Sequence, residues 1–525
     1  MNKIVVLFNT LKYLKPKQIF YQFWFRIKSI CSVKKQYTIF VSEIKPIKWE
    51  KGVYKLEAYK KVNNFSFLNL SYSFSDEIDW NFNQFGKLWT YNLNYFDFLN
   101  QKNISKETGL QLIKDFIKKD DLLNDGKEPY PISLRGINWV KFLSDNKVRD
   151  GFINNTLYNH YCILLKNLEY HLLGNHLLEN GFSLLFGAYY FQNEKFYSKS
   201  KEILFFELNE QILNDGGHFE LSPMYHQIIF SRLLDCIQLI KLNDFWKSDN
   251  LFIFLMRKAS LMNSWLQNIT FQNGDIPMVN DSTYDIAPFS NKLFTFAEKI
   301  GVPNIFQPLS DSYYRKINSK KYELFLDVGN IGPDYQPGHA HSDTFSFELH
   351  VKRLPVFVDT GITTYEKNIK RQNERETASH NTVKINEWEQ SEVWGGFRVA
   401  RRAKITSLIE KEFYISAKHC GYMKKGYEHQ RTFIWRDDII EILDTLNKST
   451  KDNAKAYFHL HSSIDKPVIK NDKVILDDKG IFISFSDFSK IKIVSYELSQ
   501  GFNISKQAFK IVVDFDQTLI TKIHL

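Results

Sequence analysis

The stretch TFSFELHV at residues 344–351 alternates apolar and polar side chains, which is the pattern of a β-strand with one buried face. Two later runs, residues 354–358 and 439–443, are apolar and rich in β-branched residues. Many short strands separated by turns predict a β-sandwich for the C-terminal part of the chain.

Upstream of this stretch the apolar spacing changes to that of helices. Apolar residues recur every three or four positions in residues 152–173, 176–193, 197–213, 223–242 and 249–268. Such a series of paired helices fits an (α/α) toroid or an α-solenoid, and the lack of a fixed-period repeat argues against a regular solenoid. Polar residues replace the apolar periodicity near 310–322, which predicts a domain boundary there.

Length, charge and cysteine content restrict the function classes. A chain of 525 residues suits two or three domains. Its net charge of +10 concentrates polyanions near the surface, so nucleic acid, acidic polysaccharide and anionic membrane all stay open on charge alone. The sequence has no zinc-finger spacing, aromatic RNA-binding signature or Lys/Arg-rich block, which argues against nucleic acid. The four cysteines form no CxxC pair and indicate neither a disulfide framework nor a cysteine-based zinc site.

The N-terminal segment, residues 1–50, is basic. Residues 1–40 contain eight Lys/Arg and no Asp/Glu, and apolar residues after Pro16 have helical spacing. Two interpretations stay open: a helix packed on the main body, which we favour, and an interfacial helix making peripheral contact with an anionic membrane. No convincing signal peptide is seen, so we expect a cytoplasmic location, with the periplasm as the alternative.

The first chemical motif is GNHLLEN at residues 174–180. His176 and Glu179 are three positions apart and share one face of a helix. Asn175 and His176 would lie at the helix start, where donors and the helix N-terminus bind anions. The alternative is that Asn175 only caps the helix and His176 is a surface residue.

The second motif is DGGHFELSPMYH at residues 215–226. Ser222 and Pro223 are typical of an N-cap and a first helical position. Tyr225 would then lie in the first turn, where nearby positive charge could lower the pKa of its phenol and let it move protons. The alternative is a half-buried Tyr225 that donates one hydrogen bond.

The third motif is GHAHSD at residues 338–343. On a strand, His339 and His341 would share one face. Asp359 and His380 follow within the next predicted strands, and two histidines with one aspartate are a plausible zinc set. His-x-His alone is a weak signal, and the two later residues strengthen it.

Aromatic and basic residues accompany these motifs as candidates for binding sugar rings and carboxylate or sulfate groups. For each of them a surface arginine or a core tryptophan is the alternative. These candidates are Trp89, Arg135, Asn138, Trp139, Trp394 and Arg398.

Together these motifs resemble the heparinase II/III family over roughly residues 50–450, with three runs in the family's order and separation. The resemblance implies a multidomain α+β chain: an N-terminal (α/α) toroid of paired helices over residues 51–310 and a C-terminal antiparallel β-sandwich over residues 322–525. It also implies a polysaccharide lyase that cleaves a uronic-acid-containing polysaccharide by β-elimination.

The resemblance implies a role for each motif residue. Asn175 and His176 would neutralise the uronate carboxylate. Tyr225 would be the catalytic base or acid, His339 the partner proton carrier, and Glu179 the residue that orients that group. The physics agrees, because donors to the carboxylate stabilise the charge that develops when C5 loses its weakly acidic proton.

The family also implies a metal and a second tyrosine. His341, Asp359 and His380 would hold a mainly structural zinc ion. Tyr365, in the loop after Asp359, is where some relatives place a second catalytic tyrosine, so it joins the substrate-contacting candidates.

The leader LKPKQI at residues 14–19 resembles the subgroup associated with bacterial surface-polysaccharide synthesis. A capsule, exopolysaccharide or O-antigen uronate polymer is therefore at least as good a candidate substrate as heparin. We expect no nucleic-acid partner, and a monomer or homodimer.

Two other functions stay open. A glycoside hydrolase on this scaffold would need two opposed carboxylates, for which Glu179 and Glu220 are candidates. A non-catalytic polysaccharide-binding protein of a capsule or exopolysaccharide assembly system would need no proton carriers. The histidine, asparagine and tyrosine of the motifs favour elimination.

Overall fold

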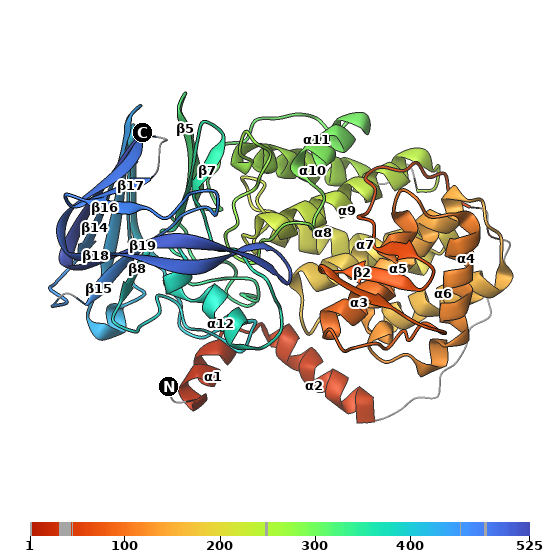
Figure 1. Ribbon diagram of the computed structural model, residues 1–525. Coiled ribbons are helices and arrows are strands. Elements are labelled where there is room, and N and C mark those ends of the chain that lie inside the picture. Colours follow the sequence, from red (N-terminus) through yellow and green to blue (C-terminus); the bar gives the residue numbers. More distant parts are fainter. Residues whose placement is uncertain (1–2, 31–43, 45, 247–249, 452, 477–479) are drawn as a thin grey trace.

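A computed structural model describes the chain except for residues 1–2, 31–43, 45, 247–249, 452 and 477–479. It consists of a helical part and a sheet part that lie side by side (Figure 1). The two parts have separate apolar cores, one from the N-terminal region to residue 325 and one across the C-terminal sheets. The predicted order, helices first and sandwich second, is confirmed.

Paired helices build the first part. Helix α7 packs between α5 and α8, and α9 packs against α10. Helix α7 is buried on almost every side, which explains its nearly continuous apolar sequence. The helices of this part are α3 (Lys87–Tyr95), α4 (Lys106–Lys118), α5 (Pro129–Asp145), α6 (Gly151–Lys166), α7 (Gly174–Phe191), α8 (Glu194–Gln211), α9 (Pro223–Leu242), α10 (Leu251–Ile269) and α11 (Ser290–Lys299).

A small antiparallel sheet precedes these helices. Strands β1 (Tyr59–Lys61), β2 (Asn64–Phe67) and β3 (Leu70–Ser73) pair in sequence order. The sheet is held on α3 by aromatic packing, with Phe67 against Trp89 at a centroid distance of 5.2 Å. Sequence periodicity did not predict these strands, because they are only three or four residues long.

Antiparallel strands build the C-terminal part. A ten-stranded sheet has the order β11-β12-β13-β14-β19-β18-β17-β16, with β15 joining β19 to β8, and a four-stranded sheet has the order β4-β5-β6-β7. Apolar side chains of both sheets meet in one core, as a sandwich requires. The strands of the smaller sheet are β4 (Tyr314–Asn318), β5 (Tyr322–Asp327), β6 (Phe347–Val351) and β7 (Leu354–Phe357).

The larger sheet ends in a long hairpin. Strands β18 (Ile481–Gly501) and β19 (Ile504–His524) run 21 residues each, and their tip reaches toward the helical part (Figure 1). There the Asn69 side chain donates to the Phe502 carbonyl at 3.0 Å. The remaining strands of this sheet are β8 (Val383–Ile385), β11 (Ile405–Lys411), β12 (Tyr414–His419), β13 (His429–Trp435), β14 (Ile439–Leu446), β15 (Ala454–His459), β16 (Val468–Lys470) and β17 (Lys473–Leu476).

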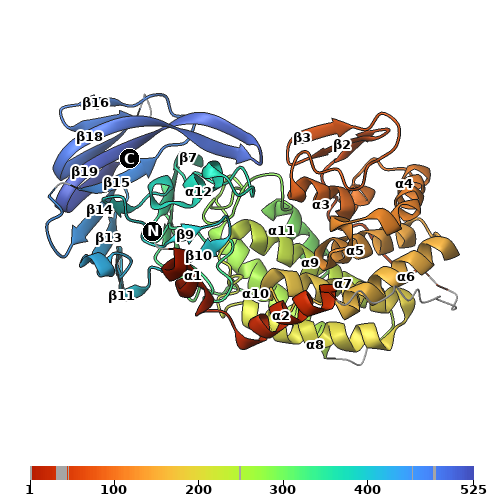
Figure 2. The ribbon, with the colours of Figure 1, turned by 90° about the horizontal axis from the view of Figure 1, so that it is seen from below.

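Short elements lie between the two parts. Strands β9 (Val393–Trp394) and β10 (Arg398–Val399) form a separate pair beside helix α12 (Ile369–Arg375). At the N-terminus, α1 (Lys3–Leu11) lies beside the sheet part and α2 (Pro16–Ile30) runs under the helical part (Figure 2).

Two predicted boundaries differ from the structure. Helix α11 ends at Lys299 and strand β4 begins at Tyr314, so β4 occupies residues that were predicted to link the domains. The strand predicted from residue 344 begins at Phe347, because Phe345 has a positive φ of 70° and Ser346 closes a turn onto Asp343. Residues 338–343 are therefore a loop, and the expectation that His339 and His341 share a strand face is wrong.

Candidate active site

A cavity of about 650 Å³ lies between the helical and sheet parts. Both parts supply its wall, together with the inner side of α1 and α2. The motif residues in its lining are Asn175, His176, Tyr225, His339, Tyr365 and Arg398. The structure therefore brings together the asparagine, histidine and tyrosine of the helices with a histidine of the sheet part.

The N-terminus of α7 already holds a carboxylate of the chain itself. The Glu220 carboxylate accepts from the Asn175 backbone N–H at 3.4 Å and from its side-chain amide at 3.1 Å. Gly174 has a φ of 58°, and a Cβ there would lie 3.1 Å from this carboxylate, so glycine suits the position. Donors at this helix start are therefore already occupied in part by Glu220.

Glu220 also holds the histidine of the sheet part. Its Oε2 lies 2.5 Å from His339 Nδ1, and its side chain is 1% exposed. Burial alone would raise the pKa of Glu220, but His339, His218 and the Asn175 N–H outweigh it and hold the pKa below its usual value. With Nδ1 facing this carboxylate, Nε2 of His339 is the nitrogen left for chemistry.

Tyr225 lies directly on this histidine. Ser222 caps α9 by accepting the Tyr225 N–H at 3.2 Å, as predicted, and the Tyr225 and His339 rings stack at 3.8 Å. The Tyr365 hydroxyl donates to the Tyr225 hydroxyl at 3.2 Å. Burial raises the pKa of Tyr225 above its ordinary value, so the expected lowering is wrong: loss of solvent outweighs the hydrogen bond from Tyr365 and the charge of Arg371.

His176 adds a cationic group at the start of α7 to the arginines that line the cavity. Its Nδ1 lies 3.0 Å from Glu169 and its ring is 4.6 Å from that of Tyr130. Burial works against the charged ring, but Glu169 and Glu220 outweigh it and raise the pKa of His176. A protonated imidazole here offers positive charge to an anionic sugar.

The predicted role of Glu179 is corrected by its contacts. Glu179 is 1% exposed and accepts from Arg232 Nε at 2.6 Å, whereas the carboxylate on His339 is that of Glu220. Glu179 thus orients an arginine that lines the cavity, and Glu220 orients the proton carrier. Sequence reasoning placed Glu220 only among hydrolase candidates.

The same contacts argue against a pair of hydrolytic carboxylates. Glu179 is bound to Arg232, and Glu220 is bound to His339. Of the acidic residues lining the cavity in the described chain, Asp97 pairs with Lys55 at 3.0 Å and Asp334 with Arg402 at 3.1 Å.

A short segment, residues 280–282, joins the two halves of the site. The Asp281 N–H donates to the His339 carbonyl at 2.9 Å, and the Asp281 carbonyl accepts from the Ser222 hydroxyl at 2.7 Å. The Asp281 carboxylate binds both terminal nitrogens of Arg371, at 2.5 and 2.7 Å. Arg371 in turn lies over the Tyr365 ring at 5.0 Å. The sequence offered no signal for this pair, whose members are 90 residues apart.

Four of the predicted sugar-contacting residues are core residues. Trp89, Trp139, Arg135 and Asn138 are all 0% exposed. Arg135 donates to the Asn94 carbonyl, Trp89 donates to the Leu70 carbonyl, and the Asn138 amide binds the Tyr95 carbonyl. Their expected substrate contacts are therefore corrected to packing roles.

The other sugar-contacting candidates lie in or beside the cavity. Tyr365 and Arg398 line it. Trp394 is half-buried next to it, donating to the Thr10 hydroxyl at 3.1 Å, and Arg398 lies over its ring at 4.9 Å.

The predicted zinc residues are close together behind the cavity. His380 Nδ1 lies 2.7 Å from Asp359, His341 Nε2 lies 2.9 Å from Asp281, and the two rings are 5.3 Å apart. In the described chain, no three His, Cys, Asp or Glu side chains are arranged as a metal site. The other ring nitrogens, His341 Nδ1 and His380 Nε2, are buried and have no hydrogen-bond partner among the residues that the structure describes.

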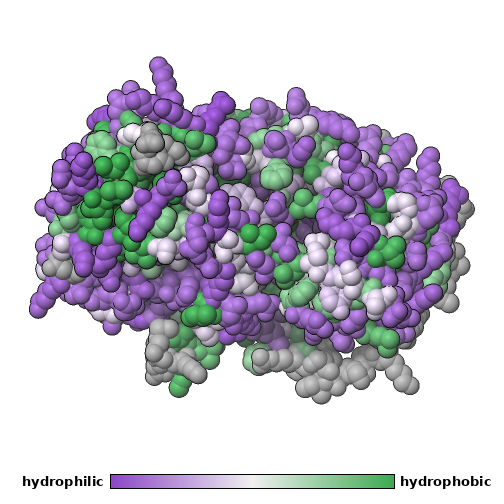
Figure 3. All heavy atoms as spheres, viewed as in Figure 1, coloured by the Kyte–Doolittle hydropathy of each residue, from purple (hydrophilic) through white to green (hydrophobic). Residues whose placement is uncertain are grey.

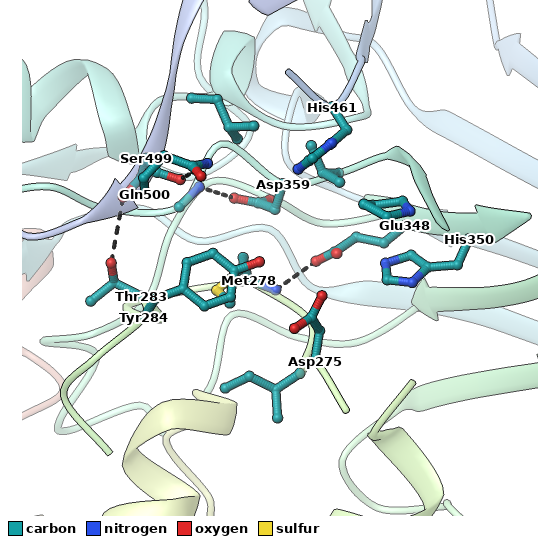
Figure 4. Close-up of a pocket in the computed structure, with 15 residues that line it drawn as sticks. Asp275, Met278, Thr283, Tyr284, Glu348, His350, Asp359, His461, Ser499 and Gln500 are labelled. Atoms are coloured by element: carbon teal, nitrogen blue, oxygen red, sulfur yellow. Dashed lines mark hydrogen bonds between the residues drawn. The ribbon is translucent and has the colours of Figure 1, made fainter. Parts of the chain in front are cut away.

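A second, much smaller cavity of about 20 Å³ is lined by Asp359 among other residues (Figure 4). Glu348 and Asp275 face it, and Glu348 accepts from the Met278 N–H at 2.6 Å. Burial and the charge of Asp359 raise the pKa of Glu348 well above its ordinary value, which favours a neutral carboxyl. The volume suits a single water molecule, so of these two cavities the larger one can hold a sugar.

Comparisons with known proteins agree along the chain. The family model described as "Heparinase II/III N-terminus" matches residues 132–299, and the one described as "Heparinase II/III-like, C-terminal" matches residues 302–524. A heparin-sulfate lyase of Bacteroides stercoris is 22% identical over 454 residues, which is 75% of this chain and 64% of the relative. The matched region thus spans less than two thirds of that relative's length.

Solved structures show the same fold. A structure of heparinase III superposes with a TM-score of 0.63 at 17% identity, covering 86% of this chain and 80% of that one. A heparan sulfate lyase mutant from Pedobacter heparinus gives a TM-score of 0.58 at 17% identity, covering 88% and 81%. Both similarities extend over the helical and the sheet part.

Proposed function

Because the chain belongs to the heparinase II/III family, we propose that it is a polysaccharide lyase that cleaves a uronic-acid-containing acidic polysaccharide by β-elimination. One observation carries the proposal: Asn175, Tyr225 and His339 line a single cavity, with the two rings stacked at 3.8 Å. Binding alone would not require two stacked proton carriers. The heparin-sulfate lyase relative supports the same reaction class.

The uronate carboxylate would be neutralised at the start of α7. His176 supplies positive charge, and the Asn175 amide supplies a second N–H beyond the one it gives to Glu220. These donors stabilise the charge that spreads onto the carboxylate as C5 loses its proton. Arg398, which lines the cavity from the sheet part, is placed to bind a further carboxylate or sulfate.

The proton transfers follow from the position of the two rings and from the protonated state of Tyr225. His339 Nε2 takes the C5 proton, the C4–O4 bond breaks as the C4–C5 double bond forms, and the Tyr225 phenol gives its proton to O4. The raised pKa of Tyr225 keeps this phenol protonated in the free enzyme, which suits an acid. Each proton carrier contributes roughly 10²–10⁴-fold to the rate.

The substrate is proposed at the level of its chemistry. The heparin-sulfate lyase relative supports a glycosaminoglycan-like polymer. The leader at residues 14–19 supports a bacterial surface polysaccharide, such as a capsule or exopolysaccharide uronate polymer. Both have the feature that the cavity needs, a carboxylate on the carbon that loses its proton.

A panel of uronic-acid polysaccharides tests the proposal. Elimination creates an unsaturated product that absorbs in the ultraviolet, and we expect Tyr225→Phe to abolish it while Tyr161→Phe keeps it. Tyr161 is a matched control because it is buried in the helical core, outside the cavity lining. New reducing ends without absorbance would instead indicate a hydrolase, and an active Tyr225→Phe would remove this residue from its role.

We also propose that His341, His380 and Asp359 hold a structural zinc ion. The two buried nitrogens that lack hydrogen-bond partners in the described chain, and the neighbouring carboxylate, are of the types that zinc prefers. Bound zinc would tie residues 341–380 together behind the cavity, without taking part in the proton transfers. Metal analysis of the purified protein should give about one zinc per chain, reduced in His380→Ala. Zinc-free protein with unchanged thermal stability would end this proposal.

A further inference from the structure

The two N-terminal helices expose apolar side chains to solvent. On α1, Ile4 and Phe8 are 77% and 68% exposed. On α2, Phe20, Phe23 and Trp24 are 62%, 61% and 49% exposed. Figure 3 shows the α1 apolar side chains on the projection below the body. Such a group of large apolar residues on neighbouring helices indicates an interaction surface.

The inner side of these helices carries polar as well as apolar residues. Gln18 is buried and its amide donates to the Leu172 carbonyl at 3.0 Å, and Asn9 is also buried. Thr10 accepts from Trp394 of the sheet part. The exposed Phe20, Phe23 and Trp24 therefore contribute little to the protein core.

Contacts in the turn between the two helices attach them to the body. Lys15 pairs with Glu210 of the helical part and lies over the Tyr335 ring at 3.9 Å. Arg402 of the sheet part lies over the Tyr13 ring at 3.8 Å. The helices are therefore attached to both halves of the molecule, and their apolar side is held outward.

The positive charge of the N-terminal segment indicates which partner binds this surface. Residues 1–42 contain eight Lys/Arg and no acidic residue, and Lys12 and Lys17 are exposed beside the apolar side chains. None of the helices in the described part of the chain has the length and apolarity needed to span a bilayer. Apolar and aromatic residues flanked by lysines match a helix that lies in the interface of an anionic bilayer.

We infer that α1 and α2 dock the protein flat onto an anionic lipid surface. The inner side of the same helices, including Leu7, Leu11 and Gln22, lines the large cavity. Docking would therefore place the cavity about one helix diameter, roughly 10–12 Å, from the lipid headgroups. A polymer carried at a membrane surface would be within reach, yet the inference stands independently of the chemistry in the cavity.

Co-sedimentation with vesicles tests the inference on the full chain. The probes are phosphatidylcholine vesicles with and without about one-third phosphatidylglycerol. We expect binding to the anionic vesicles, weakened by salt, and a loss of about tenfold in affinity for each apolar side chain removed in Phe20→Ser, Phe23→Ser and Trp24→Ser. Phe306→Ser is the matched control, because Phe306 is 80% exposed but remote from both helices.

Brominated lipids add a second readout. They should quench part of the tryptophan fluorescence of the wild type and less in Trp24→Phe, which a non-specific surface contact would not produce. None of the three α2 residues lines the cavity, so lyase activity on a soluble polymer should be unchanged by their substitution.

Several outcomes would overturn the inference. One is failure to bind anionic vesicles; another is equal binding by the triple α2 variant and the wild type. A third is a concentration-dependent dimer in light scattering that the α2 substitutions dissociate without any vesicle binding, which would assign the surface to a second copy of the chain. Activity on soluble polymer separates these results from a failure of the proposed lyase function.

Discussion

Substituting Glu220 by glutamine tests the central contact of the site. Glu220 Oε2 accepts from both His339 Nδ1 and the Asn175 amide, and Oε1 accepts the Asn175 backbone N–H. Glutamine has the same shape as glutamate and keeps one acceptor oxygen. The contacts of this oxygen with His339 Nδ1 and with the Asn175 side-chain amide can therefore persist. The negative charge is lost. The glutamine NH₂ would then face the Asn175 backbone N–H, and two donors cannot form a hydrogen bond with each other.

The magnitude follows from these contacts. A hydrogen bond to a charged group contributes about 1.5–3 kcal/mol, and each 1.4 kcal/mol is a factor of ten. We expect Glu220→Gln to lower kcat/KM by about 10- to 100-fold.

The assay is the initial rate of ultraviolet absorbance on a cleaved uronic-acid polymer, measured across pH. Glu207→Gln is the matched control: Glu207 is 1% exposed in the same helical part but outside the cavity lining, and burial raises its pKa to about 7, so it is only partly charged at neutral pH. Thermal unfolding checks that both variants fold. A folded Glu220→Gln enzyme with wild-type kcat/KM would refute the assignment of Glu220.

Three further predictions concern neighbouring contacts. Asp281→Asn leaves Arg371 buried beside a neutral partner, so we expect a loss of about 3–5 kcal/mol, seen as a lower Tm; a loss under about 1 kcal/mol would contradict a structural ion pair. His176 has a raised pKa, so its positive charge persists above its ordinary titration range and is lost at still higher pH. KM should therefore rise as pH increases through that raised value, and His176→Gln should remove the rise. Tyr365→Phe removes the donor to Tyr225 and should lower kcat about 2- to 10-fold with little change in KM; an unchanged kcat would exclude it from positioning the phenol.

Helices were predictable where local signals agree. The predicted helix 223–242 has the observed bounds of α9, because a serine cap and a proline at the first position mark its start. The helix predicted over 152–173 ends at Lys166, since apolar residues continue into the loop that leads to α7. Apolar spacing alone does not show where the chain leaves a helix.

Burial of individual side chains was not predictable in the same way. Trp89, Arg135 and Trp139 have the residue types of a sugar site, yet all three pack in the helical core. Whether an arginine or tryptophan faces a cavity or a core depends on tertiary packing, which leaves no local trace in the sequence. The motif residues Asn175 and Tyr225 were found because helix-start signals mark both positions and the family resemblance implies a role for each.

The partnerships across the two parts were hidden for a further reason: their members are far apart in sequence. Glu220 and His339 are separated by 119 residues, and residues 280–282 bind both the Tyr225 helix cap and the His339 loop. The stacked pair of proton carriers therefore exists only while the helical and sheet parts stay docked, since each part supplies one ring. A buried carboxylate without a partner is unfavourable. Asp281 and Glu220 therefore favour the docked arrangement, in which Arg371 and His339 lie beside them. The stability of the interface and the geometry of the Tyr225–His339 pair thus depend on the same few contacts. This explains why polar residues occupy the interface although they are costly to bury.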